Sequence, residues 1–340
     1  MKILNVKFFL MHFIMFTGII YFANYNKPVE VAEYNLYTAG DDSSGIYTYT
    51  ATDGIAYDYP NDAGIENDSN VLFVEKFDDG MENILGRYDN IYNDAGMSLD
   101  TDVPSESIGP NSLIMTNTGG KNTGGHLFKN FPEGFDNTVY VRYYVKYPLV
   151  SKGFIHHQGI WFGGYNPSTD YPNPRAGICG LGHSRISIAY EPVNGLMGSY
   201  LYWGEMQSDP SGNNCWGNDV VNGSPAAQKI AWDRWMCVEI MIKLNNPASA
   251  DNGELRLWQN GVEVGYWKPG FPKGTMTYGR FTVNPNGPPF KGFRWRTDAG
   301  LKINYIWIEF YDDMSPAGSS HYIKFDHLIM AKKYIGPIKS

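Results

Sequence analysis

The stretch Thr138-Val-Tyr-Val-Arg-Tyr-Tyr-Val-Lys-Tyr147 decides the fold class of this chain. Its odd positions are apolar or aromatic, whereas its even positions are phenols and cations, namely Tyr140, Arg142, Tyr144 and Lys146. Successive side chains of a strand point to opposite faces, so this alternation predicts a β-strand with one face buried. Flat rings interleaved with cations suit a hydroxyl-rich anion, and we therefore expect the even face to bind an acidic polysaccharide. Plain cross-strand packing of Tyr and Arg is the alternative.

Similar β patterns recur from Val71 onward and are separated by Gly, Pro, Asn and Asp, which favour turns. No long window has apolar residues at helical spacing. The pattern predicts an all-β fold, an antiparallel β-sandwich, within a single domain over 71–340. The expected strands are 71–77, 112–116, 138–147, 185–190, 199–206, 236–244, 254–259, 301–310 and 322–330.

Charge is distributed unevenly along the 340 residues, whose formal net charge is −8. Residues 26–70 carry nine Asp or Glu against Lys27 alone, a net of −8, so the remainder is nearly neutral. A surface that binds nucleic acid needs clustered Lys and Arg, and the composition argues against this class of partner. Low hydrophobicity with excess acid predicts that 24–70 is a disordered acidic linker.

The chain starts like an export signal. Lys2 and Lys7 precede an apolar run from Phe8 to Ala23, which is short for a membrane span and suits a signal peptide over 1–23. We therefore expect a secreted, extracellular protein without membrane contact beyond this segment. Retention of the run as an N-terminal anchor is the alternative.

Three cysteines occur, and three pairings are open to them. Cys179 and Cys215 lie in loop-like, glycine-rich sequence, whereas Cys237 lies in a strand pattern where a free buried thiol is common. We prefer a disulfide between Cys179 and Cys215. No Cys and His spacing predicts a zinc site, and no organic cofactor is expected; a structural Ca²⁺ stays open, although no loop has convincing ligand spacing.

Two further segments carry side chains suited to catalysis. The first contains His157, Gln158 and Trp161 beside the double glycine Gly163-Gly164. In the second, a predicted hairpin places Arg185 and Ser187 beside Tyr200 and Tyr202. Adjacent residues of a strand point apart, so only one imidazole of His156-His157 is expected to face a ligand.

These residue types suit β-elimination of a uronic acid polymer. The reaction needs a group that neutralises the C5 carboxylate, a base for the C5 proton and an acid for the leaving oxygen. Glycoside hydrolysis would instead need two carboxyl groups a short distance apart. The E-x-D-x-x-E pattern of sandwich glucanases is absent. Hydrolysis of a neutral polysaccharide is therefore the weaker prediction.

Several segments resemble polysaccharide lyase family fourteen, which holds alginate and glucuronan lyases with a concanavalin A-like jelly roll. They are Arg234-Trp-Met-Cys-Val-Glu239, Lys243-Leu-Asn245, Asn252-Gly-Glu254, Trp258-Gln-Asn-Gly261, Ile323-Lys-Phe-Asp-His-Leu-Ile329 and Tyr334-Ile-Gly-Pro337. The resemblance also covers Phe154 to Tyr202, so it spans most of 138–338. It implies a jelly roll and an activity on acidic polysaccharide.

The resemblance also implies site residues. The family has a segment K-L-P-G-L-x-G-G with a catalytic Lys, and that position is His157 in this chain. The family's Y-x-Y matches Tyr200-Leu-Tyr202, while its S-x-R is displaced, since Arg185 precedes Ser187 here. By this resemblance His157 is the base or carboxylate neutraliser, and Tyr200 or Tyr202 transfers a proton.

The sequence thus predicts a polysaccharide lyase, most simply a monomer, that binds acidic polysaccharide in the concave face of its sandwich. Catalysis is assigned to His157, Arg185, Tyr200 and Tyr202. Substrate binding is assigned to Tyr140, Arg142, Tyr144, Lys146, Gln158, Trp161 and Ser187, with Trp161 and Tyr144 stacking on sugar rings. A non-catalytic carbohydrate-binding or adhesion protein of the concanavalin A-like lectin type is the alternative.

Overall fold

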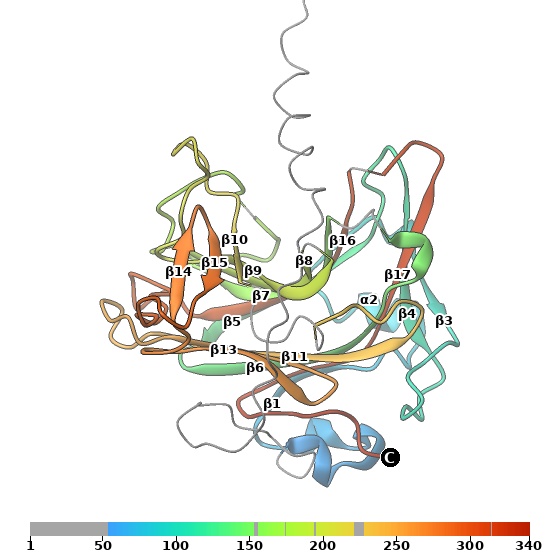
Figure 1. The fold of residues 1–340 in the computed structure, drawn as a ribbon. Helices are drawn as coiled ribbons and strands as arrows, with labels where there is room; N and C mark the ends of the chain where they lie inside the picture. The colour runs from blue at the N-terminus through green and yellow to red at the C-terminus, as the bar shows by residue number, and fades with distance from the viewer. Residues whose placement is uncertain (1–53, 153–155, 174, 194, 221–227, 314) are drawn as a thin grey trace, which may run out of the picture. The chain divides into compact units, whose positions relative to one another are not determined.

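Two β-sheets lie face to face in the computed structural model (Figure 1), which describes residues 54–340 apart from 153–155, 174, 194, 221–227 and 314. The described residues belong to one compact unit. The predicted signal peptide and the linker up to residue 53 lie outside them. No helix within the described part of the chain is long and apolar enough to cross a bilayer.

The eight-stranded sheet has the strand order β13-β12-β11-β6-β17-β4-β3, and β1 pairs with β17. Its strands are β1 (Val71–Glu75), β3 (Met97–Asp100), β4 (Ser112–Thr118), β6 (Thr138–Lys146), β11 (Trp235–Lys243), β12 (Glu254–Gln259), β13 (Val262–Trp267) and β17 (Ser320–Ala331). Every pairing in this sheet is antiparallel.

The nine-stranded sheet has the strand order β14-β15-β10-β9-β8-β7-β16-β5-β2. Its strands are β2 (Asn90–Tyr92), β5 (His126–Phe135), β7 (His157–Tyr165), β8 (Arg185–Val193), β9 (Leu196–Tyr202), β10 (Asn218–Val220), β14 (Gly274–Thr277), β15 (Arg280–Val283) and β16 (Ile303–Tyr311). Only β10 and β15 pair in parallel. The predicted all-β, antiparallel jelly-roll sandwich is confirmed.

The core fills the space between the sheets and follows the period of two. On β6 the odd residues Val139 to Val145 are fully buried in it, as the alternation predicts. Ile160 and Phe162 on β7, with Ile186 and Ile188 on β8, meet them from the other sheet. The remaining face of each sheet is then free for other contacts.

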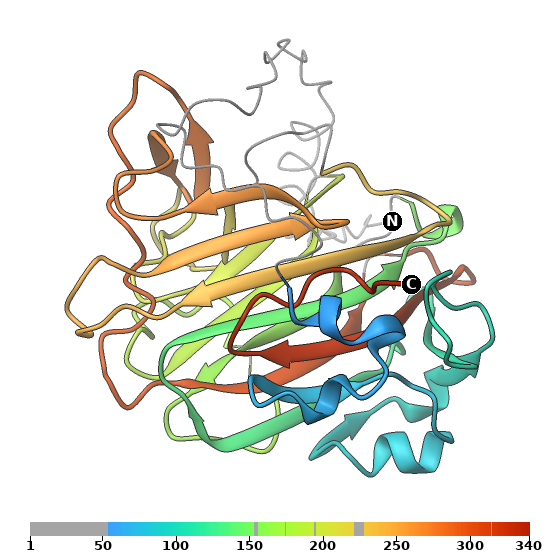
Figure 2. The ribbon, with the colours of Figure 1, turned by 90° about the horizontal axis from the view of Figure 1, so that it is seen from below.

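Short helices cover the outer face of the eight-stranded sheet, near the C-terminus (Figure 2). Ile55 and Ile65 are buried there, and the backbone N–H groups of Ile55 and Ala56 donate to the carbonyl oxygens of Tyr334 and Ile335. The prediction of disorder is therefore wrong for 54–70, because buried isoleucines, backbone hydrogen bonds and the ion pair of Asp62 with Arg142 hold this polar segment. The covering helices are η1 (Ile55–Asp58), η2 (Pro60–Asp62) and η3 (Ile65–Asn67). The described residues also form α2 (Met81–Leu85), η4 (Asp94–Gly96) and η5 (Leu149–Ser151).

The even side chains of β6 lie on this covered face of the sheet. Arg142 is completely buried and pairs with Asp62, whose carboxylate lies 2.5 Å from Nη2 of Arg142. The Tyr144 hydroxyl accepts a hydrogen bond from the backbone N–H of Ile338, and Tyr140 packs on Trp258. Lys146 pairs with Asp102 at 2.7 Å. The expectation that Tyr140, Arg142, Tyr144 and Lys146 bind substrate is wrong in this structure, since other parts of the chain occupy their face. Residues 54–70 contact Arg142 and Tyr140, the C-terminal segment contacts Tyr144, and Asp102 pairs with Lys146.

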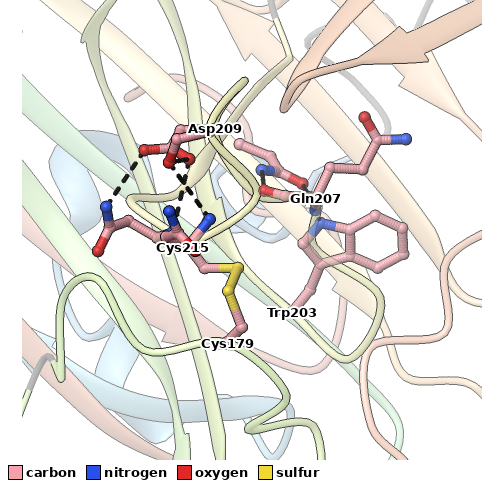
Figure 3. The surroundings of a disulfide bond; sticks show 9 residues. Cys179, Trp203, Gln207, Asp209 and Cys215 are labelled. Atoms are coloured by element: carbon pink, nitrogen blue, oxygen red, sulfur yellow. Dashed lines mark hydrogen bonds between the residues drawn. A yellow bond between two sulfur atoms is a disulfide. The ribbon is translucent and has the colours of Figure 1, made fainter.

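The preferred disulfide is confirmed. Cys179 and Cys215 are bonded, with their Cα atoms 5.0 Å apart (Figure 3), and Cys237 is free and buried. Gly177 and Cys215 also exchange two backbone hydrogen bonds of 3.1 Å. The crosslink thus joins two loops, one after β7 and one after β9, at the same end of the nine-stranded sheet.

Candidate functional site

The outer face of the nine-stranded sheet carries rings and ionisable groups where solvent-facing strands usually carry small polar residues. On β7 the odd residues His157, Trp161 and Tyr165 point away from the core, because the even ones are buried in it. β8, β9 and β16 add their own outward positions in the same way, and they contribute Arg185, Ser187, Glu191, Tyr200, Tyr202, Tyr305, Trp307 and Glu309.

Four of these side chains form a continuous series of contacts, which we call the site row: His157, Tyr200, Tyr202 and Arg185. The ring centroids of His157 and Tyr200 are 5.0 Å apart, and those of Tyr200 and Tyr202 are 5.5 Å apart. The guanidinium carbon of Arg185 lies 4.1 Å from the Tyr202 ring centroid. The structure therefore brings together the four predicted catalytic residues, with His157 and Arg185 at opposite ends.

His157 is held by a carboxylate. Its Nδ1 lies 2.8 Å from Oε1 of Glu191 and donates to it, because a carboxylate can only accept. Nε2 is then the nitrogen left to exchange protons. Burial lowers the pKa of His157, but the charge and hydrogen bond of Glu191, with smaller effects of Glu309 and Asp313, outweigh it, so the pKa lies above its ordinary value.

Both imidazoles of the pair lie together, contrary to the expectation from strand alternation. The rings of His156 and His157 are stacked 4.4 Å apart, and Nδ1 of His156 lies 2.9 Å from the Asp313 carboxylate. The reason is that β7 begins at His157, so the alternation does not extend to His156.

Arg185 is buried without a counter-ion. It is 1% exposed, and none of its three guanidinium nitrogens has a hydrogen-bond partner among the described residues. Burial lowers the pKa of Arg185, while the phenols of Tyr202, Tyr165 and Tyr305 partly offset this effect. Its nitrogens are inaccessible, so Arg185 cannot contact a ligand carboxylate in this conformation. Its visible contact is with Tyr202.

The phenols of the site row are neutral at ordinary pH. Burial raises the pKa of Tyr200 well above its usual value, and burial also raises the pKa of Tyr202, although Tyr200 and Arg185 act in the opposite direction. Tyr200 is half-buried and can reach a ligand. The backbone of Gly217 passes so close that a Cβ there would lie 2.2 Å from Cζ of Tyr200, so the disulfide-linked loop borders this phenol.

The other predicted binding residues of this region divide between two faces. Gln158 is fully buried on the face of Ile160 and Phe162, toward the core. Ser187 faces outward and accepts a hydrogen bond of 2.7 Å from the Tyr305 hydroxyl. Trp161 is only 4% exposed, with its ring centroid 6.2 Å from that of Trp307, so it forms the layer beneath the site row and presents no open ring to a sugar.

Two carboxyl groups in the site were missed from the sequence. Glu191 on β8 and Glu309 on β16 both flank Gly159 of β7, because Gly159 pairs with Glu309 and the adjacent Ile160 pairs with Tyr190. Burial raises the pKa of Glu309 to about 8, an effect that Glu191 increases and His157 opposes. The register of β16 with β7, which the sequence does not supply, places Glu309 here.

The described pockets lie elsewhere. One, of about 370 Å³, is lined by Trp203, Met276, Phe281 and Phe290 near the β14–β15 edge (Trp203 in Figure 3), and a second lies near Lys76 and His327. Neither pocket is lined by a residue of the site row. The candidate site is therefore identified by the chemistry of its side chains and not by the depth of a cavity. Over the described ranges no group of three or more His, Cys, Asp or Glu could hold a metal ion.

Comparison with known proteins gives structural neighbours only. No protein-family model matches the chain, and no curated protein matches it in sequence. The alginate lyase vAL-1 from Chlorella virus is 17% identical with a TM-score of 0.47, covering 78% of this chain and 100% of its own. The alginate lyase Aly36B is 15% identical with a TM-score of 0.45, covering 80% and 96%. The endo-β-1,4-glucuronan lyase of the fungus Trichoderma reesei is 14% identical with a TM-score of 0.41, covering 77% and 96%. These similarities assign no role to any residue of this chain.

Proposed function

We propose that the outer face of the nine-stranded sheet binds an acidic polysaccharide and cleaves it by β-elimination. The observation that carries the proposal is the site row, in which an imidazole with one free nitrogen touches a neutral, half-buried phenol. The resemblance of the segments around His157 and Tyr200 to lyase motifs supports the same reaction. The substrate class is a polymer that contains uronic acid.

In this reaction Nε2 of neutral His157 takes the C5 proton of a uronate residue. The electron pair of that C–H bond forms the C4=C5 double bond, the C4–O bond breaks, and the departing oxygen receives a proton from the Tyr200 hydroxyl. Transfer of the proton from His157 back to Tyr200 restores both groups. Tyr202 hydrogen-bonds Tyr200, and Arg185 above the Tyr202 ring stabilises negative charge on the phenols.

An extracellular location is part of the proposal. The apolar run near the N-terminus is typical of export signals, and the disulfide between Cys179 and Cys215 is typical of proteins in oxidising compartments. Polysaccharides of this kind are also extracellular material, so location and substrate agree.

The test is the ultraviolet absorbance of unsaturated uronate during incubation with alginate, glucuronan and glycosaminoglycans. We expect growth with at least one polymer, and His157→Ala should lower kcat roughly 10²–10⁴-fold, the usual contribution of a general base. His183→Ala is the matched control, since His183 is exposed and outside the site row.

Three results would contradict the proposal in different ways. Binding without absorbance would favour the non-catalytic carbohydrate-binding protein. New reducing ends without absorbance would indicate hydrolysis. Unchanged activity in His157→Ala would show that the chemistry lies elsewhere on the molecule.

A further inference from the structure

One role in the proposed elimination has no residue so far. The C5 proton becomes acidic enough to remove only if the adjacent carboxylate is neutralised, and the predicted cations do not reach the site. Arg142 and Lys146 lie on the other sheet, and the nitrogens of Arg185 are buried beside Tyr202. A different group must meet the substrate carboxylate.

The space above Gly159 is where such a group is found. Glu191, Gly159 and Glu309 follow one another across β8, β7 and β16, and the glycine carries no side chain between the two carboxyl groups. A Cβ on Gly159 would lie 2.9 Å from Cβ of Glu191, so β8 can hold Glu191 this close to β7 only because this residue is glycine. His157 lies two residues away on the same face of β7, and its Nδ1 holds Glu191.

We propose that Glu309, in its neutral form, donates a hydrogen bond to the C5 carboxylate of a uronate residue seated over Gly159, and so makes the site specific for acidic sugars. This inference rests on the proposed function and supplies its missing neutraliser. Glu191 is not available for the same role, because its Oε1 already accepts a hydrogen bond from Nδ1 of His157 and its Oε2 is buried.

The electrostatic surroundings agree with the assignment of Glu309 as donor to the substrate and Glu191 as acceptor for His157. Burial is the largest influence on Glu309 and holds its pKa near 8, so the carboxyl keeps its proton at neutral pH. A neutral carboxylic acid in an apolar setting can donate a strong hydrogen bond to a developing enolate, as an acid with a raised pKa does in ketosteroid isomerase. An ionised Glu309 would instead repel the substrate.

The other groups near Glu309 come from each neighbouring strand. β7 contributes His157, preceded by His156, and β8 contributes Glu191. On β5 His126 pairs with Glu309, and burial lowers the pKa of His126 to about 4, so it is neutral. Tyr202 on β9 and Tyr311, two residues after Glu309, also interact with the charge of Glu309.

Binding of tetrasaccharides tests the inference without relying on turnover. The probes are an alginate or glucuronan tetrasaccharide and its carboxyl-reduced, neutral analogue, titrated calorimetrically against the full chain. Wild type should prefer the acidic probe, and this preference should fall roughly tenfold per pH unit above about 8, as expected for loss of one proton. The neutral analogue should show no such change.

Two variants test whether residue 309 acts as a neutral hydrogen-bond donor to the substrate carboxylate. Glu309→Gln keeps a neutral hydrogen-bond donor, so it should retain the preference and part of kcat while losing the decline above about pH 8. Glu309→Ala should lose the preference at every pH. Glu133→Gln, the same change at an exposed position of β5 in the same sheet, is the control and should match wild type.

The outcomes are distinguishable from failure of the proposed function. An unchanged decline in Glu309→Gln, or a preference that survives in Glu309→Ala, would overturn the role of Glu309 while leaving elimination intact. A wild type that binds the acidic probe with the expected pH dependence but forms no unsaturated product would overturn the elimination and keep Glu309 as a recognition residue. Absence of binding to either probe would overturn both.

Discussion

At the scale of single residues, two fully buried arginines show how differently one side chain can be used. Arg142 is paired with Asp62, which also lies 2.8 Å from Nδ1 of His327. Burial alone would raise the pKa of Asp62, but Arg142 and His327 outweigh it and the pKa is lowered, so this carboxyl is an anion. The guanidinium of Arg185 lies over the Tyr202 ring and has no hydrogen-bond partner among the described residues. Only the first arginine therefore has an ion pair through which it stabilises the fold.

Replacing each arginine by methionine should separate these roles. Arg142→Met leaves Asp62 as a buried anion without its main partner and should lower the free energy of unfolding by about 3–5 kcal/mol. Arg185→Met removes an unpaired buried charge but also the contact with Tyr202, and should change stability by less than about 1.5 kcal/mol. Denaturant unfolding of both variants measures this, and equal losses would refute the distinction.

At the scale of elements, alternation in sequence predicts which side chains share a face but not what covers that face. The expected strand 138–147 is β6, and its odd residues are in the core. Its even residues were misassigned because their cover comes from distant segments, namely residues 54–70, Asp102 and the C-terminal segment around Ile338. The first of these has the composition of a linker, so the misassignment of Arg142 and Tyr140 follows from the wrong prediction of disorder.

Strands rich in glycine or interrupted by proline escaped prediction for a related reason. β7 contains Gly159, Gly163 and Gly164, and β5 contains Pro132, all of which weaken strand patterns. The hairpin of β8 and β9 was predicted correctly, since Ser187 pairs with Tyr202 and places Arg185 close to the same ring. Half of the site could thus be derived locally, whereas Glu191 and Glu309 depend on pairing between distant strands.

The disulfide joins two loops, one of which borders Tyr200, and its removal should therefore affect the position of this phenol. Cys179 and Cys215 are 36 residues apart, so replacing both by Ser should lower the free energy of unfolding by about 2–4 kcal/mol. Product formation should also fall, because Gly217 lies against Tyr200. Cys237→Ala removes a thiol without a crosslink and is the control. Unchanged stability of the double variant in urea unfolding would contradict the expectation.

At the scale of the whole molecule, several carboxyl groups are buried with raised pKa values. Burial raises the pKa of Glu309 to about 8 and that of Glu263 to about 7, and it raises the pKa of Asp326 well above its usual value. Between the ordinary glutamate value of 4.5 and about 8, these carboxyl groups therefore bind more protons in the folded protein than in the unfolded chain. Stability contributed by these groups is full below that window and is lost as pH rises through it.

The melting temperature should consequently fall as pH increases from about 5 to above 8. Within this range these carboxyl groups release protons when the protein unfolds, and above it they release none. Thermal unfolding across this range measures the effect, and the double variant Glu263→Gln with Glu309→Gln should flatten the curve. A melting temperature that climbs steadily toward alkaline pH would show that other titrations dominate.

The contact between Trp161 and Trp307 has a consequence beyond the chemistry of the site. These indoles are in register between β7 and β16, at 6.2 Å and an interplanar angle of 37°, although 161 and 307 are remote in sequence. Neighbouring tilted indoles couple their electronic transitions and produce a near-ultraviolet dichroic signal. The signal of this indole pair thus reports the pairing of β7 with β16, which sets Glu309 beside His157. Refolding could be followed through this signal without any added label.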